Sequence, residues 1–143
     1  MVAVDTNVLV YAHRREFAEH DRARATLSRL ADGDALWALP VFCLGEFLRV
    51  VTHHAILRPP SSLDQATQAI DALLASPSLR VLTPGERFPS LLAHTVRESG
   101  VTGNLVFDAQ IAAVCLEHGV HTVISNDRDL SRFAGISRQA LTG

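Results

Sequence analysis

The chain has 143 residues, the size of one domain, and we expect residues 1–143 to form a single unit around one core. Its 48% hydrophobic and 20% charged residues are typical of a globular protein, and no apolar run is long enough to predict a membrane span. The net charge of −2 gives no support to a non-specific nucleic-acid coat protein. All 13 basic residues are arginine, which excludes mechanisms that need a lysine.

The start of the chain and its cysteines bear on the cellular compartment. The chain opens directly into an apolar segment with no basic stretch before it, so the sequence predicts no signal peptide. Cys43 and Cys115 both lie in apolar helical segments, which favours two buried thiols over a disulfide. We therefore expect a cytoplasmic protein.

Short apolar strands alternate with amphipathic helices along the chain. The pattern predicts strands at Val2–Val4, Ala35–Leu39, Leu79–Leu82 and Thr122–Ile124. It predicts helices at about Glu19–Ala31, at Leu63–Leu74, at about Glu86–Glu98 and Phe107–His118, and a short one at Arg128–Phe133. A further helix follows the second strand, with Pro40 in its first turn and a core stripe of Val41, Leu44, Leu48 and Val51. The tail after Gly135 is too weakly patterned to predict an element. Strands separated by helices predict an α/β fold, a three-layer α/β/α sandwich with a central, mainly parallel sheet.

Four acidic residues lie in segments that otherwise have the composition of a core. Asp5 follows the first strand, Asp127 follows the last, Glu46 lies on the helix after the second strand, and Asp108 opens the helix Phe107–His118. Because ligands gather at the carboxyl ends of parallel strands, we expect these side chains to converge.

Converging carboxylates need a positive partner. Two of them about 4 Å apart repel by roughly 4 kcal/mol at an effective dielectric near 20. A set of four stays ionised only with cations between its members. Since the motifs contain no cysteine or histidine, oxygen ligands favour Mg²⁺ or Mn²⁺ over Zn²⁺.

Each acid alone also has a structural interpretation. Asp5 suits a turn or a helix cap, Glu46 an ion pair with Arg49 or Arg14, Asp108 a helix N-terminus, and Asp127 the cap of the last helix. For any single acid we would prefer that interpretation, but the set of four in this order favours a metal site.

The segments that carry these acids resemble the successive motifs of PIN domains, and most closely those of the VapC-type toxins. They are Val4-Asp5-Thr6-Asn7, Glu46 about forty residues later, Gly103-Asn104-Leu105-Val106-Phe107-Asp108-Ala109 and Ser125-Asn126-Asp127-Arg128-Asp129-Leu130. The match covers nearly the whole chain. Phe107 and Gln110 stand where related toxins often carry histidines, and the tail lacks the usual terminal strand with an Asn-Pro.

The resemblance implies a metal-dependent endoribonuclease, the toxin of a type II toxin–antitoxin pair. It makes Asp5, Glu46, Asp108 and Asp127 the catalytic, metal-binding quartet, with Asp5 and Asp108 as the principal ligands of Mg²⁺ or Mn²⁺. The supporting polar residues would be Asn7, Asn104, Ser125 and Asp129. The implied partners are an RNA substrate, a small antitoxin with a basic tail, and a second copy of the chain in a homodimer. The sequence does not name the RNA.

Within the last motif, helical geometry separates Asp127 from Asp129. Two residues apart on a regular helix, their side chains would point roughly 200° away from each other. We therefore expect that only one of the two carboxylates reaches the ion, and that Asp127 is the closer to it. Loss of the Asp129 charge should have the milder effect on activity.

Other features point to rival functions. The pair His118 and His121 has no third ligand nearby, so a zinc site is not predicted, and the arginines between residues 14 and 29 fit a solvated helix face better than an RNA-binding stripe. A phospho-aspartate domain would need a second acid where Asn7 stands and a lysine. The remaining alternative is a catalytically inert PIN-like RNA- or protein-binding module.

Overall fold

The structure, a computed structural model, describes residues 1–141. Its elements are β1 (Val2–Val4), α1 (Thr6–His13), α2 (His20–Asp32), β2 (Trp37–Pro40), α3 (Phe42–Val51), α4 (Leu63–Leu74), β3 (Leu79–Leu82), α5 (Phe88–Ser99), α6 (Leu105–Glu117), β4 (Thr122–Ile124), the 3₁₀ helix η1 (Arg128–Arg132) and β5 (Ser137–Gln139). The five strands form one sheet in the order β3-β2-β1-β4-β5, and every neighbouring pair is parallel.

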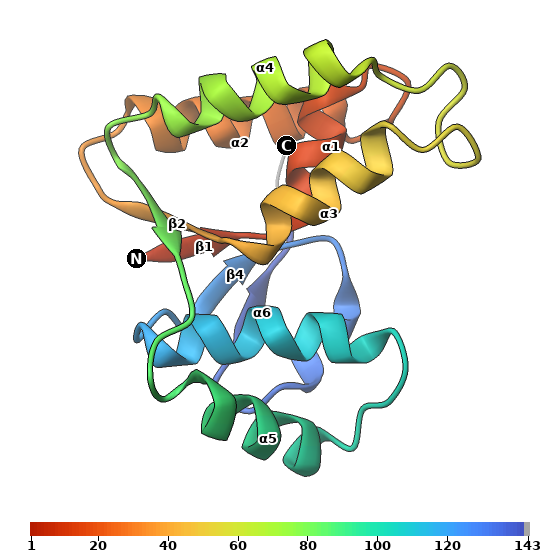
Figure 1. The fold of residues 1–143 in the computed structure, drawn as a ribbon. Coiled ribbons are helices and arrows are strands. Elements are labelled where there is room, and N and C mark those ends of the chain that lie inside the picture. The colour runs from red at the N-terminus through yellow and green to blue at the C-terminus, as the bar shows by residue number, and fades with distance from the viewer. Residues whose placement is uncertain (142–143) are drawn as a thin grey trace.

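The helices cover both faces of the sheet. Figure 1 shows α1, α2, α3 and α4 on one side and α5 and α6 on the other. This arrangement confirms the predicted α/β/α sandwich. Among the described helices, none is long and apolar enough to cross a bilayer.

The hydrophobic core lies on both faces of the sheet, around its central strands. Trp37 and Leu39 of β2 are fully buried, and α6 buries six residues between Ala109 and Cys115 because it lies between the sheet and α5. A helix that is apolar all round is the type that packs inside a fold. As expected, the thiols of Cys43 and Cys115 are buried and free.

The first half of the chain differs from the prediction in two places. Residues 6–13 form the unpredicted helix α1. Pro40 is the last residue of β2, where it pairs with Leu82, and does not lie in the first turn of a helix. Its lack of an N–H is tolerated there because the pairing of β2 with β1 ends at Ala38, so that Pro40 lies at the end of the strand beyond that ladder.

The core face of α3 also differs from the prediction. The helix buries Cys43, Phe47 and Val51, whereas Leu44 and Leu48 are only partly buried. Cys43 and Phe47 thus take the places predicted for Leu44 and Leu48, each one residue earlier in the chain, and Val51 is buried as predicted.

The C-terminal tail was predicted to lack a strand, and this was wrong. Ser137–Gln139 forms β5, which extends the sheet beside β4. Its side chains are largely exposed, so the sequence has no hydrophobic alternation there. Backbone hydrogen bonds to β4 hold it instead.

The strand order fixes where a ligand would bind. The chain winds outward from β1 to β2 and β3 and then returns to β4 on the other side of β1. Ligands of parallel sheets bind at the carboxyl edge where the winding direction reverses. Val4 pairs with Ile124, so the residues that follow them, Asp5 and Ser125, lie side by side at that edge.

Candidate active site

Asp5 is the most enclosed acid of the site. It is 4% exposed and forms the N-cap of α1, accepting a hydrogen bond from Thr6 N to Oδ1 at 2.7 Å. Its Oδ2 accepts from Ser125 Oγ at 2.7 Å and from Asn7 Nδ2 at 3.2 Å. Three donors therefore fix the orientation of one buried carboxylate.

The pKa of Asp5 is raised above its usual 3.8, because burial disfavours its charge more than the hydrogen bonds from Ser125 and Thr6 favour it. The negative charge of Asp127 raises it further. A buried carboxylate with three donors and no positive neighbour is suited to a cation, which would remove this penalty.

Ser125 connects the two strand ends. Its hydroxyl donates to Asp5 and accepts from Asn7 Nδ2 and Asp127 N, each at 2.9 Å. Ser125 is fully buried, so water does not compete for these bonds. One side chain thereby sets the positions of two acids that are 122 residues apart in the chain.

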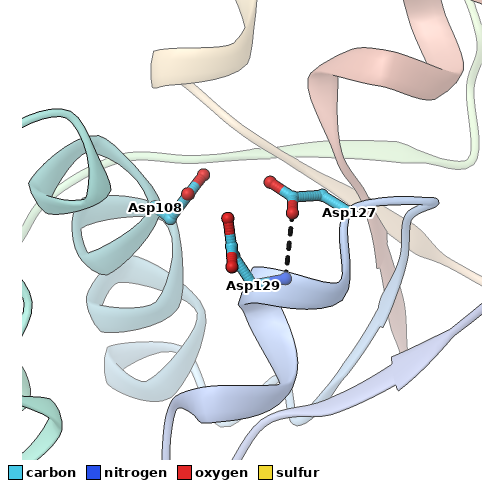
Figure 2. Close-up of side chains that lie close together, drawn as sticks. All are labelled: Asp108, Asp127 and Asp129. Atoms are coloured by element: carbon cyan, nitrogen blue, oxygen red, sulfur yellow. Dashed lines mark hydrogen bonds between the residues drawn. The ribbon is translucent and has the colours of Figure 1, made fainter.

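Asp108, Asp127 and Asp129 gather opposite one another. Each offers a carboxylate oxygen, and the three atoms lie within 4.8 Å of one another. Figure 2 shows Asp108 on α6 facing the other two across the space between α6 and η1, and Asp127 Oδ1 accepting from Asp129 N at 2.9 Å. Asp129 also pairs with Arg132 at 2.8 Å.

The expectation that Asp127 and Asp129 cannot reach one ion is therefore wrong. It assumed that both residues lie on one regular helix. Asp127 is the N-cap of η1 and has extended backbone angles (φ −83°, ψ 111°), and η1 is a 3₁₀ helix of five residues. The angular spacing of an α-helix does not apply to such a pair.

The four acids of the predicted quartet line one cavity of about 280 Å³. Its lining is Asp5, Thr6, Asn7, Val10, Tyr11, Glu46, Val50, Asp108 and Asp127. No lysine, arginine or histidine is in this lining, as far as residues 1–141 show. The structure thus brings together all four acids from four different segments.

The negative charges in this cavity repel one another. Burial, followed by the charges of Asp127, Asp5, Glu46 and Asp129, raises the pKa of Asp108 from 3.8 to about 7. Burial and then Asp5 raise the pKa of Glu46. Such shifts in a cleft mark functional sites more often than structural ones.

The structural interpretations of single acids hold for some of them. Asp5 and Asp127 do cap α1 and η1, and Asp108 does lie in the first turn of α6. Glu46, by contrast, forms no ion pair with any described residue, and Arg14 pairs with Glu16 at 2.6 Å. Capping and ligand binding are compatible, since a cap uses one oxygen of a carboxylate.

The donor set fits a hard divalent cation. It consists of carboxylate oxygens, which suit Mg²⁺ or Mn²⁺. Thr6 also lines the cavity, and its Oγ1 is buried and has no hydrogen-bond partner. An unpartnered buried hydroxyl at an acidic cavity is a second sign that a ligand belongs there.

Some predicted and unpredicted residues lie around this centre. Asn104 is the N-cap residue of α6, but its side chain is exposed and makes no capping bond. Tyr11 and Thr6 line the cavity, and sequence reasoning missed both. Their positions within the apolar run of α1 gave no signal that they face the acids.

The histidines do not form a zinc site. His118 bonds to Thr83 O at 2.8 Å and His121 to Gly135 O at 3.0 Å. In the described part of the chain, the only cluster with metal-ligand spacing is the acidic one.

Comparisons with known proteins identify the family of this chain. A family model described as the PIN domain matches residues 2–136. Ribonuclease VapC43 of Mycobacterium tuberculosis is 43% identical over 133 residues, covering 93% of this chain and 90% of that protein. Ribonuclease VapC25 of the same organism is 34% identical over 136 residues, 95% of each chain.

Two solved structures share the fold. VapBC2 from Rickettsia felis, bound to a promoter DNA fragment, has a TM-score of 0.72 at 18% identity and covers 99% of this chain and 100% of its own. VapC20 of Mycobacterium tuberculosis, a toxin that cleaves the sarcin-ricin loop, has a TM-score of 0.66 at 21% identity, with coverage of 95% and 98%. At these identities the likeness concerns the fold alone.

Proposed function

The chain belongs to the PIN-domain family and, within it, to the VapC ribonucleases, and from this premise we propose that it cleaves RNA at the acidic cavity with a bound divalent cation. The observation that carries the proposal is the convergence of Asp5, Glu46, Asp108 and Asp127 on one cavity without a cationic side chain. Their mutual repulsion makes the empty cavity costly, and a cation removes that cost.

Asp5 and Asp108 would be the principal residues that hold Mg²⁺ or Mn²⁺, with Glu46 and Asp127 beside them. When bound there, the cation neutralises negative charge at the phosphodiester and activates water for attack. This also explains how an acidic cavity receives a polyanion.

The other tasks fall to the chain itself. Ser125 and Asn7 donate to Asp5, favour the ionised form of its carboxylate and fix its orientation. Because Ser125 Oγ also accepts from Asp127 N, one hydroxyl connects the ends of the two strands. A site held within small tolerances by such bonds loses little energy to reorganisation during the reaction.

The test is RNA cleavage by the purified protein with Mg²⁺ or Mn²⁺, with and without EDTA. We expect EDTA, Asp5→Asn and Asp108→Asn each to abolish cleavage. Asp71→Asn, an exposed change on α4, is the matched control and should cleave like the parent. A folded parent that binds no metal and cuts no RNA would instead establish the inert binding module.

We also propose that this ribonuclease is the toxin of a toxin–antitoxin pair. Solved structures that share the fold include VapBC2 from Rickettsia felis and FitAB, each bound to a DNA fragment. A small antitoxin with a basic tail would place an arginine among the carboxylates and pair with them in a bidentate manner. Growth arrest on induction, relieved by the adjacent small reading frame, is the expected result.

The proposal also covers the oligomeric state of the protein and its cellular compartment. We expect a homodimer in the cytoplasm, although the chain ends in a short strand without the Asn-Pro usual in related toxins. Light scattering of the free protein and of its antitoxin complex measures the assembly. A monomer in both states would contradict the dimer.

A further inference from the structure

The Thr6 hydroxyl is an anomaly in an otherwise well-satisfied core. Thr6 is 3% exposed, and its Oγ1 is one of two buried side-chain polar atoms without a hydrogen-bond partner among residues 1–141. A buried hydroxyl without a partner loses its hydration and gains nothing in return. Such an atom needs an explanation.

The position of Thr6 in α1 explains why no local partner exists. Thr26 and Thr67 lie further inside their helices, and Thr52 follows the end of α3. All three donate to the carbonyl four residues earlier, at 2.9, 2.6 and 2.9 Å. Thr6 is the first residue of its helix, and the residue four positions earlier is Val2 in β1. Its hydroxyl is therefore directed to groups outside its own helix.

The groups within its reach are Glu46 and Cys43. Contact with the Thr6 hydroxyl lowers the pKa of both side chains, and Thr6 lines the same cavity as Glu46, although neither contact meets the geometry of a hydrogen bond in this structure. Cys43 Sγ is already directed at Val4 O, at 3.9 Å. Apart from its contact with Thr6, no donor reaches the Glu46 carboxylate among the described residues, although burial and Asp5 both disfavour its charge.

We propose that Thr6 is a positioning residue whose hydroxyl donates a hydrogen bond to the Glu46 carboxylate and holds it in the orientation that binds the divalent cation. The inference rests on the proposed function, because it assigns Glu46 to the metal site. A bond from a neutral hydroxyl to an ionised carboxylate is charge-assisted and stronger than a neutral one. It would satisfy two groups that otherwise lack partners, one a donor and the other an acceptor.

The test is calorimetric titration of the full chain with Mn²⁺, supported by unfolding curves in EDTA. Thr6→Val replaces the hydroxyl by a methyl group of similar size, and Thr6→Ser keeps the hydroxyl. We expect Thr6→Val to bind Mn²⁺ about tenfold more weakly and to unfold no earlier than the parent, since it loses an unpaired polar atom. Thr6→Ser should bind Mn²⁺ with an affinity within about twofold of that of the parent, because it retains the hydroxyl that donates the hydrogen bond.

Two controls separate this role from others. Thr26→Val removes a buried hydroxyl far from the cavity and should leave Mn²⁺ binding unchanged. In a Glu46→Ala background, Thr6→Val should have no further effect, because the acceptor is gone. An equal effect in both backgrounds overturns the inference, and so does unchanged Mn²⁺ binding by Thr6→Val. A parent that binds no Mn²⁺ overturns the proposed function and this inference together.

Discussion

The charge on Asp108 should make the metal-free protein less stable as the pH rises. Its pKa in the folded chain is about 7, against an ordinary value of 3.8. Below pH 4 the folded and unfolded chains both carry the proton, so no penalty exists. Between pH 4 and 7 the unfolded chain releases the proton first, and stability falls until both forms are ionised.

The size of this effect follows from the same two values. A difference of about 3 between the two pKa values, at about 1.36 kcal/mol each, gives at most about 4 kcal/mol. Asp108 is only half-buried, and water screens part of its repulsion. We therefore expect Asp108→Asn to stabilise the metal-free protein by about 1–2 kcal/mol at pH 8, or roughly 3–8 °C in Tm.

The assay is thermal unfolding of parent and Asp108→Asn in EDTA, from pH 4 to pH 8. The stability difference between them should be near zero at pH 4, grow up to pH 7 and then level off. Asp71→Asn should show no such rise. With saturating Mn²⁺ the order should reverse, because the parent then binds the cation more tightly. A difference between the two proteins that does not change with pH would refute the repulsion argument.

Changes at four further positions test the site and the core. Ser125→Ala removes the strongest side-chain donor to Asp5, so the pKa of Asp5 should rise and the pH profile of Mn²⁺ binding should shift to higher pH, as measured by titration at several pH values. Asp127→Asn should keep thermal stability within a few tenths of a kcal/mol, since Asn caps as well as Asp, but lose cleavage at least tenfold; Asp127→Ala should also lose about 1 kcal/mol of stability. Asp129→Asn should lose less activity, because an ion pair already holds one of its oxygens. Trp37→Phe, which removes a buried indole hydrogen bond at 3.1 Å, should lower the free energy of unfolding by about 1–3 kcal/mol and leave Mn²⁺ affinity unchanged.

Much of the fold was predictable because the hydrophobic pattern of a segment reflects which of its side chains are buried. β1, β3 and β4 lie at the predicted residues, since buried strands of a parallel sheet are continuous apolar runs. The helix Leu63–Leu74 was also predicted at its observed bounds, because Ser62 and Gln65 form a capping box at its start.

The two elements that were not predicted, α1 and β5, lack such a hydrophobic pattern. α1 is apolar on nearly all sides, so it shows neither the period of an amphipathic helix nor that of a half-buried strand. β5 is short, polar and largely exposed, and only its backbone bonds to β4 define it. In both cases tertiary contacts determine the conformation.

For the site, the sequence determined which residues carry the chemistry, because carboxylates in apolar segments are costly without a partner and are therefore conspicuous. Only the tertiary structure decided how they meet. The pairing of Val4 with Ile124 places Ser125 against Asp5, the 3₁₀ turn brings Asp129 to Asp108 and Asp127, and the first position of α1 leaves Thr6 without a local acceptor. Such contacts depend on strand register and on the packing of segments more than a hundred residues apart, which no local pattern encodes.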